Sequence, residues 1–275
     1  QNVVSSNYST VSGGQSNTAS TNTHATVVGG LSNTASGQYS IAGGKSVTAS
    51  GRNSIAFGGL NTTSTASGQN SIVLGGEGNT ATNFNSIAIG GGCSSTAING
   101  VALGINSLAY LRGQQSFATG QFSILGDAQQ SLLTAYKSDT LTTGATTVLS
   151  LDGSGTGYLL IPNGNNRAWN VQVNWVAVVT AITGTATGIT VGDVVTSVDL
   201  LGFKRVGGIS SASAHTSAAT KTMVTTPAQY AGCSIAYTAG ASQEMAMTFT
   251  GPTFVGGGSV TMRVVARVEL SEVAW

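Results

Sequence analysis

Residues Asn53-Ser54-Ile55-Ala56-Phe57-Gly58 form the phrase that decides the fold, because close copies of it recur along the first half of the chain. Residues 70–75 read NSIVLG and residues 85–90 read NSIAIG. A second phrase, such as Thr65-Ala66-Ser67-Gly68, alternates with the first. The glycines that mark successive repeats lie 14 to 17 residues apart, and they are Gly13, Gly29, Gly43, Gly58, Gly75, Gly90, Gly104 and Gly120. A repeat of this length is too short for a helix pair or a propeller blade.

The repeat predicts one coil of a parallel β-solenoid, with two short strands and two turns. Stacked coils rise by one strand spacing, ~4.8 Å, and together build a continuous core. We therefore expect about eight coils over residues 1–121. Glycine suits corners that need a positive φ, and asparagine tolerates the same region. The glycines expected to have this structural role are Gly29, Gly43, Gly58, Gly75, Gly90, Gly104 and Gly120.

Alternation within the first phrase gives each coil two apolar faces. A period of two sends Ile55 and Phe57 to one face of the strand and Ala56 to the other. One coil can hide only one of these faces inside itself. We expect the second face to be covered by partner chains, in a homo-oligomer closed around a fibre axis.

The repeats NSIAxG and TASG closely resemble the head of trimeric autotransporter adhesins, the YadA-like left-handed β-roll, over roughly residues 8 to 121. The resemblance implies a homotrimer of parallel β-rolls. Some heads of this kind bind collagen through NSVAIG-type motifs, and close versions here are Asn53–Gly58, Asn70–Gly75 and Asn85–Gly90. The alternative is that these residues only encode the stacking of coils.

The period stops after Gly120. We interpret residues 122–145 as a connector that closes the solenoid, whose end needs a cap. Residues 146–275 contain alternating strands separated by Gly, Ser and Thr-rich loops, which predicts an antiparallel β-sandwich. The expected strands include Thr147–Leu151, Gly157–Ile161, Trp169–Trp175, Val195–Arg205, Glu244–Thr250 and Ser259–Val273.

This second half resembles a C-terminal domain common in bacteriophage tail fibres and other virion appendages, where it also follows YadA-like repeats. The match lies in Gly126–Gln129, Leu151–Gly153, Leu160–Asn163, Ala168-Trp169 and Val264–Leu270. The resemblance implies an extracellular virion protein that contacts other tail proteins and a bacterial surface receptor, either a glycan or an outer-membrane protein.

The composition argues against several classes of protein. Only 7% of the 275 residues are charged and the net charge is +1, so no basic patch for nucleic acid is expected.

No apolar run is long enough for a spanning helix, and we expect no membrane insertion. Trp275 leaves open the alternative of an outer-membrane anchor strand. Cys93 and Cys233 are expected to be small buried hydrophobes.

No catalytic site, cofactor or metal is predicted. Glycan-cleaving enzymes use paired carboxylates, and the nine acidic residues here are not clustered. His24 and His215 are expected in exposed coil or loop positions, although one histidine on a three-fold axis could supply three metal ligands. Several Asp residues next to turn-type residues are expected to cap the backbone, namely Asp127, Asp139, Asp152 and Asp193.

The sequence favours a trimeric fibre that attaches to a bacterial surface by binding. The candidate binding residues lie around the loops of the second half, and they are Lys204, Arg205, His215 and Tyr230. Three alternatives stay open: the head of a bacterial trimeric autotransporter adhesin, a purely structural virion spacer or decoration protein, and a glycan depolymerase. Whether the chain is part of a longer fibre stays open as well.

Overall fold

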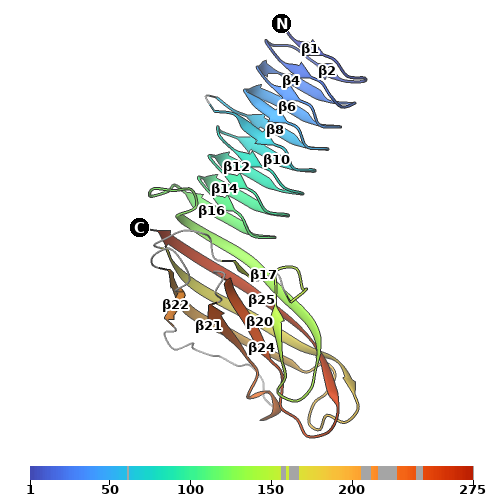
Figure 1. The fold of residues 1–275 in the computed structure, drawn as a ribbon, viewed down its shortest axis with the longest axis vertical. Coiled ribbons are helices and arrows are strands. Elements are labelled where there is room, and N and C mark those ends of the chain that lie inside the picture. The colour runs from blue at the N-terminus through green and yellow to red at the C-terminus, as the bar shows by residue number, and fades with distance from the viewer. Residues whose placement is uncertain are drawn as a thin grey trace. The chain divides into compact units, whose positions relative to one another are not determined.

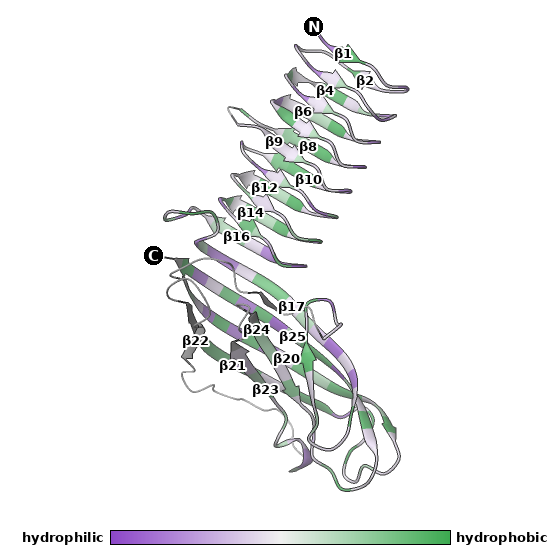
Figure 2. Cartoon of the chain, viewed as in Figure 1, coloured by the Kyte–Doolittle hydropathy of each residue, from purple (hydrophilic) through white to green (hydrophobic). Residues whose placement is uncertain are grey.

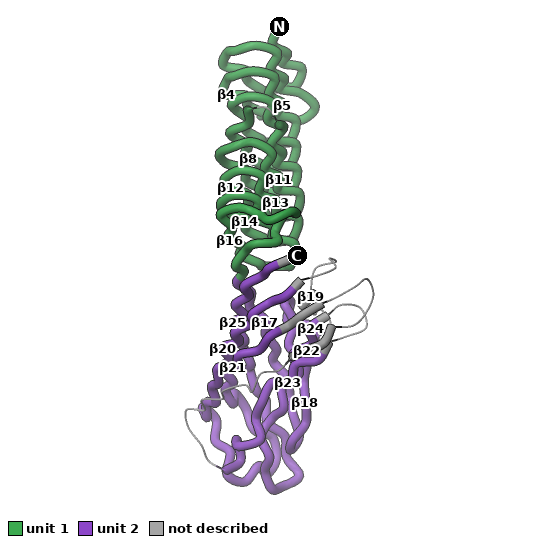
Figure 3. The backbone as a smooth tube through the Cα atoms, turned by 90° about the vertical axis from the view of Figure 1, so that its left-hand side faces the viewer, with its two compact units in different colours: residues 1–131 green, residues 132–275 purple. Residues whose placement is uncertain are grey.

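The structure is a computed structural model that describes residues 1–60, 62–155, 159–160, 167–205, 212–215, 228–239 and 244–274. The chain divides into two compact units, Gln1–Ser131 and Leu132–Trp275 (Figure 3). The protein is all-β, as predicted, and the one short helix in the described part of the chain is the 3-10 turn η1 (Ala228–Tyr230). No helix within these ranges is long and apolar enough to cross a membrane.

The first unit is a parallel β-solenoid of eight coils (Figure 1), which confirms the predicted roll. One sheet stacks the strands of the second phrase, which are β1 (Val3–Val4), β3 (Thr18–Ala19), β5 (Thr34–Ala35), β7 (Val47–Ala49), β9 (Ser64–Ala66), β11 (Thr80–Ala81), β13 (Ser94–Ser95) and β15 (Leu108–Ala109). The other stacks the strands of the first phrase, which are β2 (Thr10–Val11), β4 (Thr26–Leu31), β6 (Ile41–Lys45), β8 (Ile55–Gly58), β10 (Ile72–Gly75), β12 (Ile87–Gly91), β14 (Val101–Ile105) and β16 (Gln115–Thr119).

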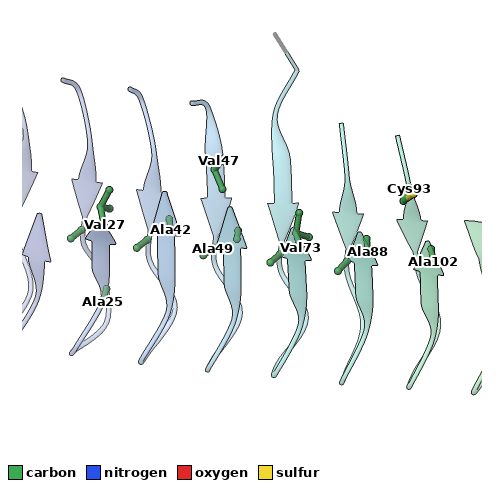
Figure 4. Packing of buried hydrophobic residues seen from close by; sticks show 14 of the residues in the cluster. Ala25, Val27, Ala42, Val47, Ala49, Val73, Ala88, Cys93 and Ala102 are labelled. Carbon is green, nitrogen blue, oxygen red and sulfur yellow. The ribbon is translucent and has the colours of Figure 1, made fainter. Parts of the chain in front are cut away.

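The core of the roll consists of small side chains, because the space inside one coil is narrow. Ala56 and Val73, in adjacent stacked strands, are fully buried, and so is Ala66 on the opposite sheet. Figure 4 shows Val73, Ala88 and other members of this cluster between the two sheets. The alternation in the repeat therefore points the small residue inward, and the bulky pair faces outward.

A column of glycines brings successive coils into close contact. At Gly90 (φ +130°) a Cβ would collide with the carbonyl oxygen of Gly104 in the next coil. Gly58, Gly75 and Gly104 also have positive φ, as predicted. Gly29 has positive φ as well, but its neighbour Gly30 (φ +110°) is the one that meets the Gly44 carbonyl oxygen of the next coil.

Two of the predicted glycine roles are wrong. Gly43 does not have a positive φ; it makes room for the ring of Phe57, and Gly44 (φ +117°) stands in the column instead. Gly120 lies beyond the last strand and nothing packs where its Cβ would be, whereas Ala118 pairs with Gly104.

Buried asparagines reinforce the stack. The Nδ2 group of Asn33 donates to the carbonyl oxygens of Gly29 and Gly44, at 3.0 and 2.7 Å. Its Oδ1 atom accepts from the backbone N–H of Val47. Asn79 repeats this pattern with Gly75 and Gly90. Each side chain satisfies backbone groups that no strand partner reaches.

The segment predicted as a connector, residues 122–145, is a connector only in part, because strand β17 (Ala128–Leu141) occupies most of it. Side chains at the start of this segment close the end of the roll. The amide of Gln129 accepts from the N–H of Leu108 at 2.9 Å and donates to its carbonyl at 3.0 Å, as a peptide group of a further strand would. The carboxylate of Asp127 accepts from the N–H groups of Phe122, Ser123 and Ile124. The outer edge of β15 is thereby paired.

The second unit contains two antiparallel sheets. The first has the strand order β17 (Ala128–Leu141), β25 (Ser259–Ala274), β20 (Arg167–Thr183), β21 (Val194–Arg205) and β22 (Ala212–His215). The second has the order β18 (Thr146–Leu149), β24 (Glu244–Thr250) and β19 (Leu159–Leu160), with β23 (Ser234–Ala239) also paired to β24. Trp175 of the first sheet meets Phe249 of the second edge to face, with ring centroids 5.6 Å apart.

Candidate functional site

An apolar stripe runs along the outward face of the roll. It consists of the bulky residues of the first phrase, which are Ile55, Phe57, Ile72, Leu74, Ile87, Ile89, Val101, Leu103 and Phe117. Register places them in columns, with Ile55 beside Ile72 and Phe57 beside Leu74. In Figure 2 these positions colour strands β8, β10 and β12 green.

The stripe is only partly covered within one chain. Ile89 is 37% exposed and Phe117 is 51% exposed. Each apolar side chain removed from water contributes roughly 1.5–3 kcal/mol when fully buried. A contiguous exposed apolar surface of this kind is typical of an interface. The stripe is therefore the candidate assembly surface of the first unit.

Three of the four predicted binding residues lie on neighbouring strands of the second unit, and His215 is in a strand where a loop was expected. Register pairs Lys204 with Ser213 and Gly202 with His215, so the backbones of Lys204, Arg205 and His215 lie on the two neighbouring strands β21 and β22. Their side chains lie outside the described part of the structure, as do most of the loop residues around them.

Tyr230 is a correction to the predicted set, because its ring is buried. Its exposed fraction is 1%, and its hydroxyl donates to Oδ2 of Asp193 at 2.6 Å. Burial and this carboxylate raise the pKa of Tyr230. The ring fills the interior next to η1 and offers no face for stacking on a sugar.

A buried carboxylate cluster in the second unit was missed from the sequence. Asp199 is 1% exposed, and its carboxylate accepts from the Tyr237 hydroxyl at 2.6 Å, Trp175 Nε1 at 3.2 Å and Ser197 Oγ at 3.0 Å. The sequence contains a signal for this burial, because Asp199 occupies an inward position in an alternating strand. The donors satisfy the carboxylate and burial keeps solvent away, so the cluster is a structural polar contact between β20, β21 and β23.

Three other carboxylates, those of Asp127, Asp152 and Asp193, cap turns as predicted. Asp139 instead lies within strand β17, where it accepts from the hydroxyl of Thr147 and the N–H of Thr140. Asp152 accepts from the N–H and hydroxyl of Ser154 and from the hydroxyl of Ser150, and these hydrogen bonds lower its pKa to about 2. Burial acts to raise the pKa of Asp127, but its backbone hydrogen bonds outweigh this effect and hold it below the ordinary value. Asp193 accepts from the N–H of Thr190.

The cysteines and His24, which could take part in chemistry, do not lie together in one site. Cys93 and Cys233 are buried, as expected, and are not joined in a disulfide. Burial raises the pKa of the Cys93 thiol. His24 is exposed at a corner of the roll, where its ring stacks between Tyr8 and Tyr39. Among the residues that the structure describes, no group of three His, Cys, Asp or Glu side chains could hold a metal ion.

Two shallow hollows lie on the described part of the second unit. One, of about 360 Å³, is lined by residues that include Thr143, Gln229 and Phe254. The other, of about 380 Å³, lies on the outward face of the sheet, beside Val176 and Val265. Neither contains a cluster of titratable groups.

No known protein family and no curated protein matches the chain. Searches of solved structures find the tailspike protein of Acinetobacter phage vB_ApiP_P1, with 11% identity and a TM-score of 0.26, over 95% of this chain and 54% of that one. They also find the tailspike protein of Acinetobacter baumannii phage AM24, with 10% identity and a TM-score of 0.27, over 94% of this chain and 48% of that one. The chain thus spans about half the length of these two neighbours, which are similar to it only weakly.

Proposed function

We propose that this chain is part of a bacteriophage tail fibre or similar virion appendage, and that it attaches to a bacterial surface as a homotrimer without catalysis. The apolar stripe carries the proposal. A parallel roll that leaves bulky apolar residues on one outward face over five successive coils, from β8 to β16, needs a partner there. A closed ring of identical chains around a fibre axis covers all copies equally.

The low charge and the engaged carboxylates support binding over catalysis. Cleavage of a glycoside needs two carboxylates free to act on the substrate. The carboxylates of Asp127, Asp152 and Asp199 each accept several hydrogen bonds from their own surroundings. Three rigid copies of a weak binding surface would attach strongly through multivalency.

The assembly is tested by native mass in solution, measured by light scattering over a dilution series. A trimer has a mass of about 82 kDa, three times 27.4 kDa. Ile89→Asp places a charge in the stripe and is expected to weaken the trimer. Thr82→Asp, at an exposed position next to β11 on the other sheet, is the matched control. A native chain that stays monomeric would require the proposal to be withdrawn.

Attachment is tested with labelled native protein on a panel of bacterial strains. Saturable binding that unlabelled chain competes away is the expected result. A stable trimer that attaches to no strain would instead favour the structural spacer. Release of reducing ends from surface polysaccharide would favour a depolymerase.

A further inference from the structure

One corner of the roll carries a column of three stacked aromatic rings. Tyr8, His24 and Tyr39 occupy the same turn position in three successive coils. The ring centroids are 5.0 Å apart in both pairs, with interplanar angles of 17° and 30°. Tyr8 is 79% exposed and Tyr39 is 47% exposed, so the column lies at the surface.

Folding of the corner does not require these rings. In later coils the same position holds Asn53, Asn70, Asn85 and Asn99, all with positive φ of 54° to 57°. Their side-chain amides form a continuous ladder, with hydrogen bonds of 3.0, 3.0 and 3.1 Å.

The rings adopt the same strained conformation, with φ of 59°, 64° and 59° for Tyr8, His24 and Tyr39. A bulky residue with positive φ costs about 1–3 kcal/mol, and such residues concentrate at ligand sites. The chain thus uses a less favourable residue where asparagine suffices. A contact between these rings and a partner outside the chain would offset this conformational cost.

The surroundings of the column specify the chemistry of its partner. Residues 1–44 contain no Asp, Glu, Lys or Arg, so recognition cannot rest on ion pairs with side chains of this region. The flanking polar groups in these three coils are neutral, and they include the Ser6–Ser9 hydroxyl pair and Asn22. The first charged side chain along this corner is Arg52, next to Asn53 in the following coil. Aromatic rings with polar edges among neutral hydrogen-bonding groups suit a partner with an apolar face and a rim of hydroxyls. A sugar ring has this form.

We propose that the corner formed by Tyr8, His24 and Tyr39 binds a linear, uncharged saccharide chain of the bacterial surface. This inference rests on the proposed attachment function and assigns its contact surface to the first unit. The rings repeat every 5.0 Å along the roll, so a saccharide chain that runs along the corner meets one ring in each coil. The Asn ladder continues the same line with amide donors and acceptors.

The chain itself supplies the test variant. The triple substitution Tyr8→Asn, His24→Asn and Tyr39→Asn replaces the rings with the residue that later coils use, so we expect the roll to fold and melt as before. Phe122→Asn removes another exposed ring of the first unit, 71% exposed and away from this corner, and is the matched control. The probes are neutral linear hexasaccharides of glucose, galactose and N-acetylglucosamine, with binding measured by calorimetry on the full chain.

We expect the native chain and Phe122→Asn to bind at least one of these probes, and the triple variant to bind it roughly tenfold or more weakly. Equal binding by the triple variant, or native binding to none of the neutral probes, overturns the inference. Attachment to bacterial cells is measured in parallel. If the native chain attaches to cells and the triple variant attaches equally well, the saccharide corner is refuted and the attachment function stands. If the native chain attaches to no strain, the attachment function itself fails.

Discussion

Substitution of a single stacking glycine should open the roll, and the neighbouring glycine provides the control. Gly90 has φ +130°, and an added Cβ would collide with the Gly104 carbonyl oxygen of the next coil. That oxygen also accepts from Cys93 Sγ at 3.1 Å, and the Gly90 carbonyl accepts from Asn79 Nδ2 at 2.7 Å. Relief of the collision therefore disturbs the hydrogen bonds on both sides of the coil.

The magnitude follows from two contributions to the free energy of unfolding. The left-handed backbone costs a residue with a Cβ about 1–3 kcal/mol, and forced separation of packed groups costs about 1–3 kcal/mol more. We expect Gly90→Ala to lose roughly 3–5 kcal/mol, a fall in Tm of roughly 10–20 °C. Gly91→Ala has open space and no positive φ, so it should change stability by less than about 1 kcal/mol.

The assay is thermal and urea unfolding of the full chain, followed by circular dichroism. Both variants remove one glycine from the same strand, so differences in the unfolded chain largely cancel. A Gly90→Ala protein that melts within a degree or two of the native chain would refute the steric argument. The same holds if Gly91→Ala proves the more damaging of the two.

Three further predictions concern polar contacts. The pKa of Asp127 is lowered in the fold. Its carboxylate therefore stabilises the native state above about pH 4, and this contribution is lost as the pH falls below that value. Asp127→Asn should flatten the dependence of Tm on pH below about pH 4. Gln129→Ala leaves the edge of β15 unpaired and should cost about 2–4 kcal/mol in urea unfolding, whereas the exposed Gln130→Ala should cost almost nothing. Tyr237→Phe removes one hydrogen-bond donor to the buried Asp199 and should lower the free energy of unfolding by about 1–3 kcal/mol. An unchanged free energy of unfolding would indicate that the carboxylate is solvated.

Much of the first unit could be predicted from local sequence. The repeat length sets the size of a coil, and the alternation of Ile55, Ala56 and Phe57 separates an inner from an outer face. The register of the glycines could not be predicted in full. Where two glycines adjoin, as at Gly43 and Gly44, only the stacked neighbour shows which of them lies under the next coil's carbonyl.

The second unit shows more clearly which features local sequence does not predict. Alternation correctly predicted the long strands β20, β21 and β25, and β21 carries Asp199 on its inward side. It missed the long strand β17, which lies in the segment expected to be a connector. It did not predict that Tyr237, which is 38 residues away, would donate to this carboxylate. It also did not predict that Tyr230 would be buried rather than exposed in a loop.

The stacked rings of Tyr8, His24 and Tyr39 illustrate the same division. Each residue is visible in its own repeat, but their alignment in one column depends on turn lengths that place this position in register from each coil to the next. Strand periodicity is a property of neighbouring residues and is therefore written in the local sequence. Contacts between coils and between sheets depend on how distant segments align, and that alignment exists only once the chain has packed.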